Sequence, residues 1–165
     1  MSISVPKSWK DVKIHQYRQI LNVKDLTDRE KTIKIISILS GVHKKDLLSM
    51  SASELSPIIS DLLFTNSSPS AEIITRFTVG DITFGLIPDL NQLTVGEIMD
   101  LEEYVADWNN SIHKIVGVLY RPIIKEDTLS YEIEQYDSFR ALKAADLFDK
   151  ELSIEIGYAI SLFLF

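Results

Sequence analysis

The segment between residues 93 and 123 constrains the fold most, because its pattern predicts two consecutive helices. Thr94 followed three residues later by Glu97 is a capping box, in which the hydroxyl accepts the glutamate N–H and the carboxylate accepts the threonine N–H. Leu93 and Ile98 have the spacing of a hydrophobic staple across this helix start. The apolar residues expected on one face of the first helix are Ile98, Leu101, Val105 and Trp108. The segment therefore predicts a helical hairpin that packs against a core.

The turn and the end of this hairpin are also indicated. Asn109 and Asn110 predict the turn, and Ser111 can cap the second helix. Pro122 is expected to end that helix, because proline cannot continue the backbone hydrogen bonds of a helix.

Four segments of the N-terminal third also predict helical structure. They are residues 14–23, 28–40, 42–48 and 51–64, the third being a basic connector that can hold a helical turn. Capping boxes begin two of them, formed by Thr27 with Glu30 and by Ser51 with Glu54. Apolar residues nearly encircle the 28–40 segment, so we expect that helix to be central to the core.

The β signal is confined to a few segments. The strand-like runs are residues 72–78, 82–87 and 130–136. Gly80 and Asp81 form a two-residue turn of the kind that joins hairpin strands. Two more helices are expected at 138–148 and 153–165. Few, segregated strands favour an α+β fold that is mainly α-helical: a helical N-terminal part, a β-hairpin plus one further strand, and a C-terminal helical part.

The domain organisation is expected to be simple. At 165 residues the chain predicts a single domain, with residues 65–70 as the one obvious linker. That linker allows a helical subdomain at 1–64 and an α+β subdomain at 71–165. Residues 1–65 carry ten basic and seven acidic residues, a net charge of +3, whereas residues 66–165 carry seven and seventeen, a net charge of −10. Two differently charged solvated surfaces, or head-to-tail contact between copies, would both account for this asymmetry.

Composition excludes several classes of protein. The chain has no cysteine, which excludes disulfides, thiolate metal sites and a cysteine nucleophile. Its net charge of −7 argues against broad nucleic-acid binding, because phosphate contacts need clustered Lys and Arg. We expect no secretory signal and no membrane association, since no apolar run reaches the ~20 residues of a span.

Candidate catalytic and metal-binding groups do not form a known pattern. The three histidines, His15, His43 and His113, are far apart and lack metal-ligand spacing. The densest acidic cluster comprises Glu97, Asp100, Glu102, Glu103 and Asp107. Paired carboxylates can hold Mg²⁺ or act as acid and base, but this spacing is typical of an exposed acidic helix face. No nucleophile elbow or Gly-rich phosphate loop is present, so we expect no catalytic residue, metal or cofactor.

Large aromatic and apolar residues are the candidates for a partner interface. These residues are Trp9, Trp108, Tyr120, Leu162, Phe163, Leu164 and Phe165. For each tryptophan and tyrosine, a place in the core is the alternative. The apolar run that begins at Ile160 predicts either a buried final helix or an exposed patch that awaits a partner.

Several segments together resemble small proteins of tailed bacteriophages, especially crAss-like phages and their relatives. The segments that carry the resemblance are residues 6–12 with Gln16 and Tyr17, residues 77–87, the helix start at 93–97, His113-Lys114, residues 119–123, Tyr131-Glu132-Ile133 and the apolar final helix. The resemblance implies a role in virion structure or morphogenesis, either near the portal and tail or as a tail assembly chaperone.

Three hypotheses follow. The first is a non-enzymatic virion component that forms a multi-copy complex with itself and with other phage proteins, located in the virion or in the host cytoplasm during assembly. The second is a tail assembly chaperone that shields apolar surfaces of a tail protein and is absent from the mature particle. The third is a metal-dependent enzyme that uses the acidic helix face.

Overall fold

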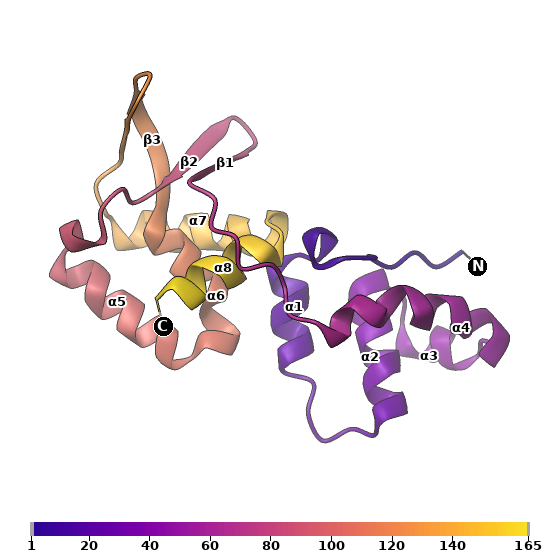
Figure 1. The fold of residues 1–165 in the computed structure, drawn as a ribbon. Coiled ribbons are helices and arrows are strands. Elements are labelled where there is room, and N and C mark those ends of the chain that lie inside the picture. Colours follow the sequence, from indigo (N-terminus) through magenta and orange to yellow (C-terminus); the bar gives the residue numbers. More distant parts are fainter. Residues whose placement is uncertain (1, 165) are drawn as a thin grey trace.

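The computed structural model describes residues 2–164 and shows an α+β fold that is mainly helical, as predicted (Figure 1). The N-terminal third contains helices only. They are η1 (Trp9–Asp11), α1 (Ile14–Leu21), α2 (Asp28–Ser40), α3 (Lys44–Leu48), α4 (Ala52–Asp61) and η2 (Leu62–Asn66). The predicted capping boxes form at Thr27 and Ser51, and Gly41 ends α2 in a left-handed conformation.

The remaining chain combines one sheet with four longer helices. Its elements are β1 (Arg76–Val79), β2 (Ile82–Leu86), η3 (Leu90–Gln92), α5 (Val95–Ala106), α6 (Trp108–Leu119), β3 (Tyr120–Glu126), β4 (Tyr131–Ile133), α7 (Ser138–Glu151) and α8 (Ile154–Phe163). No helix within residues 2–164 combines the length and the apolar character that a membrane span requires.

The sheet is antiparallel with the strand order β1-β2-β3-β4. The predicted hairpin is confirmed, and Gly80 takes a positive φ of 59° in its turn. The face that carries Phe77 and Phe84 packs over α7, where both rings contact Phe148 edge to face.

Strand β3 was not predicted. The helix that Pro122 was expected to end stops at Leu119, and Pro122 lies inside the strand. The carbonyl of Pro122 accepts the N–H of Glu134, just beyond the end of β4. The backbone N–H that Pro122 lacks would point in the same direction as its carbonyl, beyond the end of β4. Strand β3 therefore tolerates the proline at little cost.

The turn of the helical hairpin also differs from the prediction. It falls at Asp107, whereas Asn109 and Asn110 belong to the first turn of α6 and Ser111 is buried within it. The buried face of α5 carries Glu97, Leu101 and Tyr104, while Ile98 is 42% exposed.

Helix α6 is the centre of the core, a place expected for residues 28–40. It packs against α1, α5, α7 and α8, and its buried residues run without a break from Ile115 to Leu119. Helix α2 buries Ile33, Ile36 and Leu39 along one side and exposes much of the rest. Apolar residues on several sides of α2 therefore do not imply that the helix is enclosed.

Helices α2, α3 and α4 form a lobe at one side of the molecule (Figure 1). Helix α1 lies between this lobe and the rest, in contact with α2 on one side and with α6 and α7 on the other. The backbone just before α1 pairs with the start of α8, through Ile14 N–Leu152 O at 3.1 Å and Ile154 N–Val12 O at 2.8 Å. The lobe and the rest of the chain are therefore linked twice, by the segment at 65–70 and by the contacts of the first 21 residues.

Candidate functional site

Three hollows of several hundred Å³ lie in the surface of the described residues. We call them the polar cleft (about 440 Å³), the lobe groove (about 760 Å³) and the sheet–α7 cavity (about 470 Å³). They differ in the chemistry of their walls.

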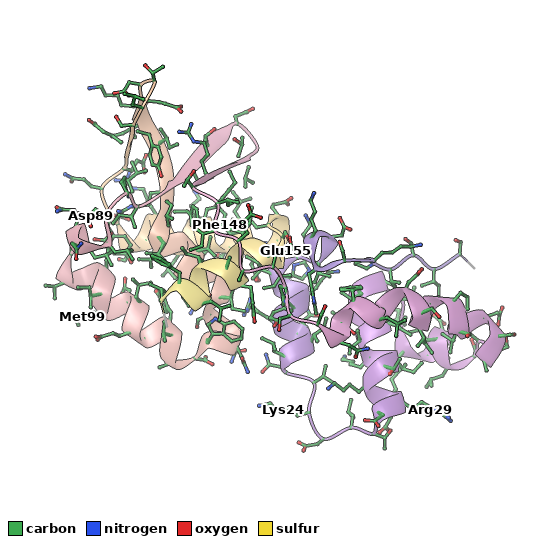
Figure 2. The ribbon with its side chains drawn as sticks, viewed as in Figure 1. Lys24, Arg29, Asp89, Met99, Phe148 and Glu155 are labelled. Carbon is green, nitrogen blue, oxygen red and sulfur yellow. The ribbon has the colours of Figure 1, made fainter. Side chains whose placement is uncertain are left out.

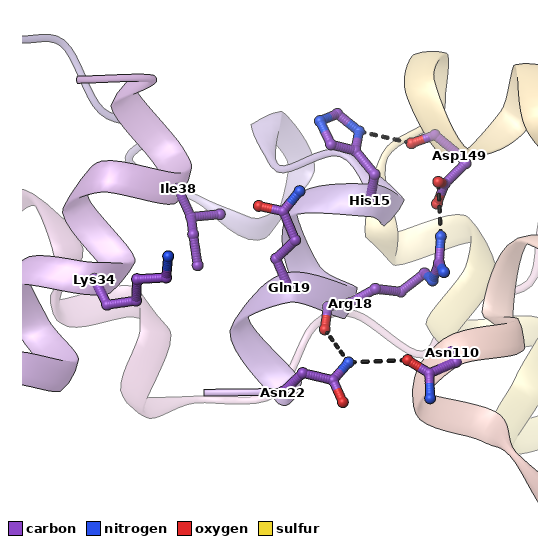
Figure 3. A pocket seen from close by; sticks show the side chains of 8 residues that line it. All are labelled: His15, Arg18, Gln19, Asn22, Lys34, Ile38, Asn110 and Asp149. Carbon is purple, nitrogen blue, oxygen red and sulfur yellow. Dashed lines mark hydrogen bonds and ion pairs between the residues drawn. The ribbon is translucent and has the colours of Figure 1, made fainter. Parts of the chain in front are cut away.

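The polar cleft lies between α1, α2, α6 and α7 (Figure 3). Its lining residues are His15, Arg18, Gln19, Asn22, Lys34, Ile38, Asn110 and Asp149. The guanidinium of Arg18 donates to Asp149 at 2.7 Å, and His15 Nδ1 donates to the Asp149 backbone carbonyl at 2.9 Å. Asn22 donates to Asn110 at 3.0 Å, which adds a link from α1 to α6. These bonds hold α1 against α6 and α7.

His113 lies behind this cleft, 6% exposed, with Nδ1 4.0 Å from a carboxylate oxygen of Asp149. Burial, together with the positive charge of Arg18, lowers the pKa of His113 to about 4. The imidazole is therefore neutral near pH 7. Within residues 2–164, no group of three or more His, Asp or Glu side chains is placed to hold a metal ion.

The lobe groove is apolar and open. Its apolar walls are formed by Ile33, Leu47, Leu48, Met50, Leu55 and Ile59. Leu48 is 63% exposed and Ile59 43% exposed, so the lobe presents large apolar side chains to solvent.

The sheet–α7 cavity is hollow because small residues line its base. Gly117 on α6 lines the cavity together with Ala141 and Ala144 on α7, and a Cβ on Gly117 would lie 2.6 Å from the Ala141 carbonyl oxygen. The apolar walls consist of Ile82, Phe84, Tyr120, Pro122 and Leu147. Small residues beneath larger apolar walls produce a concave, mostly apolar site.

Charged side chains surround the mouth of this cavity. Arg140 is 3.2 Å from Glu134 and lies near Asp137, and Arg121 pairs with Glu97. Lys143 also lines the cavity but takes part in no ion pair found within residues 2–164. It is therefore the cation at this mouth with no carboxylate partner in the described chain.

The acidic cluster predicted on α5 is divided between two environments. Glu97 is 1% exposed and binds both Arg121 and the backbone N–H of Thr94, so its prediction as part of an exposed face is wrong. Asp100 accepts a hydrogen bond from the hydroxyl of Tyr136, and burial, together with this bond, raises the pKa of that tyrosine. Glu102, Glu103 and Asp107 are exposed as predicted. The carboxylates do not converge on one point.

Two of the predicted interface residues belong to the core. Trp9 is 7% exposed and packs edge to face on Tyr17 and Phe64, and Tyr120 is 1% exposed and donates its hydroxyl to Ile74 O. Other parts of the chain already cover both side chains, so the prediction that they contribute to a partner interface is wrong.

The other predicted interface residues are more accessible. Leu162 is 44% exposed and Phe163 52% exposed, while Trp108 and Leu164 are partly buried. Phe165 lies outside the described residues.

The sequence analysis missed one exposed apolar surface on α5. Val95, Ile98 and Met99 are 73%, 42% and 63% exposed, and Figure 2 shows Met99 at the outer side of the helix, away from the core residue Phe148. The i, i+3, i+4 spacing of the three residues was visible in the sequence, but only Ile98 was assigned to a face, the one toward the core, and Val95 and Met99 were assigned to none.

Comparisons of the chain with protein-family models, with curated proteins and with solved structures found no match.

Proposed function

We propose that this protein is a non-enzymatic structural or assembly protein of a tailed phage virion that acts through protein–protein contacts in a multi-copy complex. The observation that carries the proposal is the exposure of large apolar side chains at three separate places. These are the end of α8, the outer side of α5 and the lobe groove. Exposed apolar groups of this kind mark surfaces that other proteins cover.

The charge distribution supports contact between copies. The surplus of +3 in residues 1–65 and the surplus of −10 in residues 66–165 favour an arrangement in which unlike surfaces of neighbouring copies meet. Such a head-to-tail arrangement produces rings or filaments, and multi-copy virion parts need extended contacts of this type.

The phage context and a location near the portal and tail come from the sequence resemblance. The polar groups fit this proposal, because Arg18, Asp149 and Glu97 are engaged in contacts between elements of the chain itself.

A tail assembly chaperone is the second candidate. Leu162 and Phe163 favour it, because two adjacent exposed apolar side chains at a helix end could bind an apolar segment of an unassembled tail protein.

Quantitative mass spectrometry of purified particles separates the two functions. A virion component is expected in mature particles at several copies per particle. A protein that is abundant in infected cells during assembly but absent from mature particles would contradict the first proposal and support the chaperone.

A further inference from the structure

The last turn of α8 leaves two large apolar side chains without cover. Ile160 and Ser161 are fully buried, yet Leu162 and Phe163, which follow them directly, are 44% and 52% exposed. The same turn contains no basic residue, so nothing on the helix offsets the partial negative charge of its carbonyl end. The end of α8 therefore presents an apolar tip beside a weakly negative helix terminus.

The sheet–α7 cavity has the complementary properties. Its volume of about 470 Å³ is roughly three times that of a ~150 Å³ cavity that accommodates benzene, so it can admit a phenyl ring and a leucine side chain together. Lys143 at its mouth carries a positive charge that no carboxylate within residues 2–164 neutralises by an ion pair. Cations at the carbonyl end of a helix are stabilising.

The tip and the cavity cannot meet within one molecule as folded. The cavity is built from β2, β3, α6, α7 and the segment that follows β4, and no residue of α8 lines it. The exposed strip of α5 fits the cavity less well, because its three apolar residues lie along the side of a helix. The adjacent pair at the end of α8 can enter a concave hollow.

We propose that the end of α8 in one copy of this chain inserts Leu162 and Phe163 into the sheet–α7 cavity of a second copy, with Lys143 of the receiving copy beside the carbonyl end of the inserted helix. The contact joins two different surfaces, so each copy keeps one free tip and one free cavity, and assembly continues to a ring or a filament. This inference rests on the proposed multi-copy function and specifies one contact. Both surfaces of this contact lie within residues 66–165, so it depends on Lys143 and not on the charge difference between the two parts of the chain.

Two variants test the proposal separately. Leu162→Ser with Phe163→Ser removes the tip at positions that are about half exposed, so the fold should persist. Ala144→Leu adds side-chain volume to a partly buried residue that lines the cavity. The control is Phe139→Ser, which removes an apolar side chain that is 77% exposed on the same helix but does not line the cavity.

Sedimentation velocity over a concentration series measures the result. The wild-type protein and the Phe139→Ser control should associate as the concentration rises to about 100 µM, and each of the two variants should associate at least about tenfold more weakly. A mixture of the tip variant and the cavity variant retains one complete contact, so it should form a one-to-one complex and nothing larger.

Several results would overturn the inference. They are a wild-type chain that stays monomeric, a tip variant that associates like the wild type because another segment fills the cavity, or two variants that form no complex when mixed. If circular dichroism shows that Ala144→Leu does not fold, Lys143→Glu replaces it, because a negative charge there should weaken association by repelling the helix end. A monomeric wild type that is nevertheless present in purified particles would contradict this contact and leave the proposed function standing.

Discussion

Burial changes the chemistry of single side chains most clearly at His113. Its imidazole lies beside the ion pair of Arg18 and Asp149, and no atom of residues 2–164 forms a hydrogen bond with its Nδ1. The sequence placed this histidine on a helix without metal-ligand spacing, but it did not indicate how deeply the side chain is buried. Its neutral state depends on the fold, because burial and the Arg18 charge lower its pKa, whereas Asp149 opposes that shift.

This lowered pKa predicts an effect of pH on stability. The pKa of His113 is about 4 in the folded chain against an ordinary value of 6.5, so between these values the unfolded chain binds more protons. The contribution of the neutral His113 to stability is complete above pH 6.5. We expect the unfolding free energy of the wild type to fall by up to about 3 kcal/mol relative to that of His113→Gln as the pH falls toward 4. Urea unfolding at a series of pH values measures this difference. Parallel pH profiles for the two proteins would contradict the expected role of the histidine.

The secondary-structure elements separate into those with local signals and those without. Helix α2 has the predicted bounds, because a capping box and a left-handed glycine determine its two ends within the segment itself. Strand β3 has no such local signal, and its proline, Pro122, was interpreted as the end of a helix. It becomes a strand because β2 and β4 lie on either side of it.

Contact between strands also explains why position 85 is a glycine. Tyr131 on β4 reaches across β3 to β2, where its hydroxyl donates to Leu86 O at 2.7 Å. A Cβ on Gly85 would lie 2.5 Å from Cε2 of this ring. We expect Gly85→Ala to reduce the unfolding free energy by about 1–3 kcal/mol, because the ring must move. Chemical denaturation monitored by circular dichroism measures the loss.

Gly96→Ala is the matched control for this substitution. A Cβ at position 96 would meet only Thr94 Oγ1, at 3.9 Å, and alanine is the better helix former in α5. The control should therefore be neutral or stabilising. Equal losses for the two glycine variants would show that the Tyr131 contact is not the cause.

At the scale of the whole molecule, the first 21 residues join parts that the linker at 65–70 separates in the sequence. Trp9 donates to Ser67 O at 2.7 Å and contacts Phe64, while Val12 and Ile14 pair with the start of α8. The helical lobe and the α+β part therefore share one core cluster, and the unfolding of one part should expose the core of the other.

We accordingly expect the whole chain to unfold in a single transition. In a Trp9→Phe variant, Trp108 reports on the α+β part, and far-ultraviolet circular dichroism reports on all helices. The two signals should have the same urea midpoint in this variant, and likewise in Trp108→Phe, where Trp9 reports on the junction. An earlier loss of the circular dichroism signal alone would mean that the lobe unfolds independently.

The sequence identified part of the candidate interface but not its exposure. Leu162 and Phe163 were identified from their apolar character, but a buried and an exposed final helix were equally compatible with that run. The structure divides the run, because Ile160 faces the core whereas Leu162 and Phe163 extend beyond it. The sheet–α7 cavity could not be predicted, since it arises where Gly117 and Ala141, distant in the sequence, face each other.

The sequence by itself determined the capped starts of α2, α4 and α5, the turn of the β-hairpin and the mainly helical class, because caps, turn residues and periodicity act within a few neighbouring residues. The tertiary structure alone decided which faces are buried. Glu97 and Tyr120 are buried, whereas Met99 is exposed. The hydrogen-bond partners of the two buried residues, Arg121 and Ile74, and the helices around them come from distant parts of the chain. Burial depends on these long-range neighbours, and local residue patterns do not specify which of them will meet.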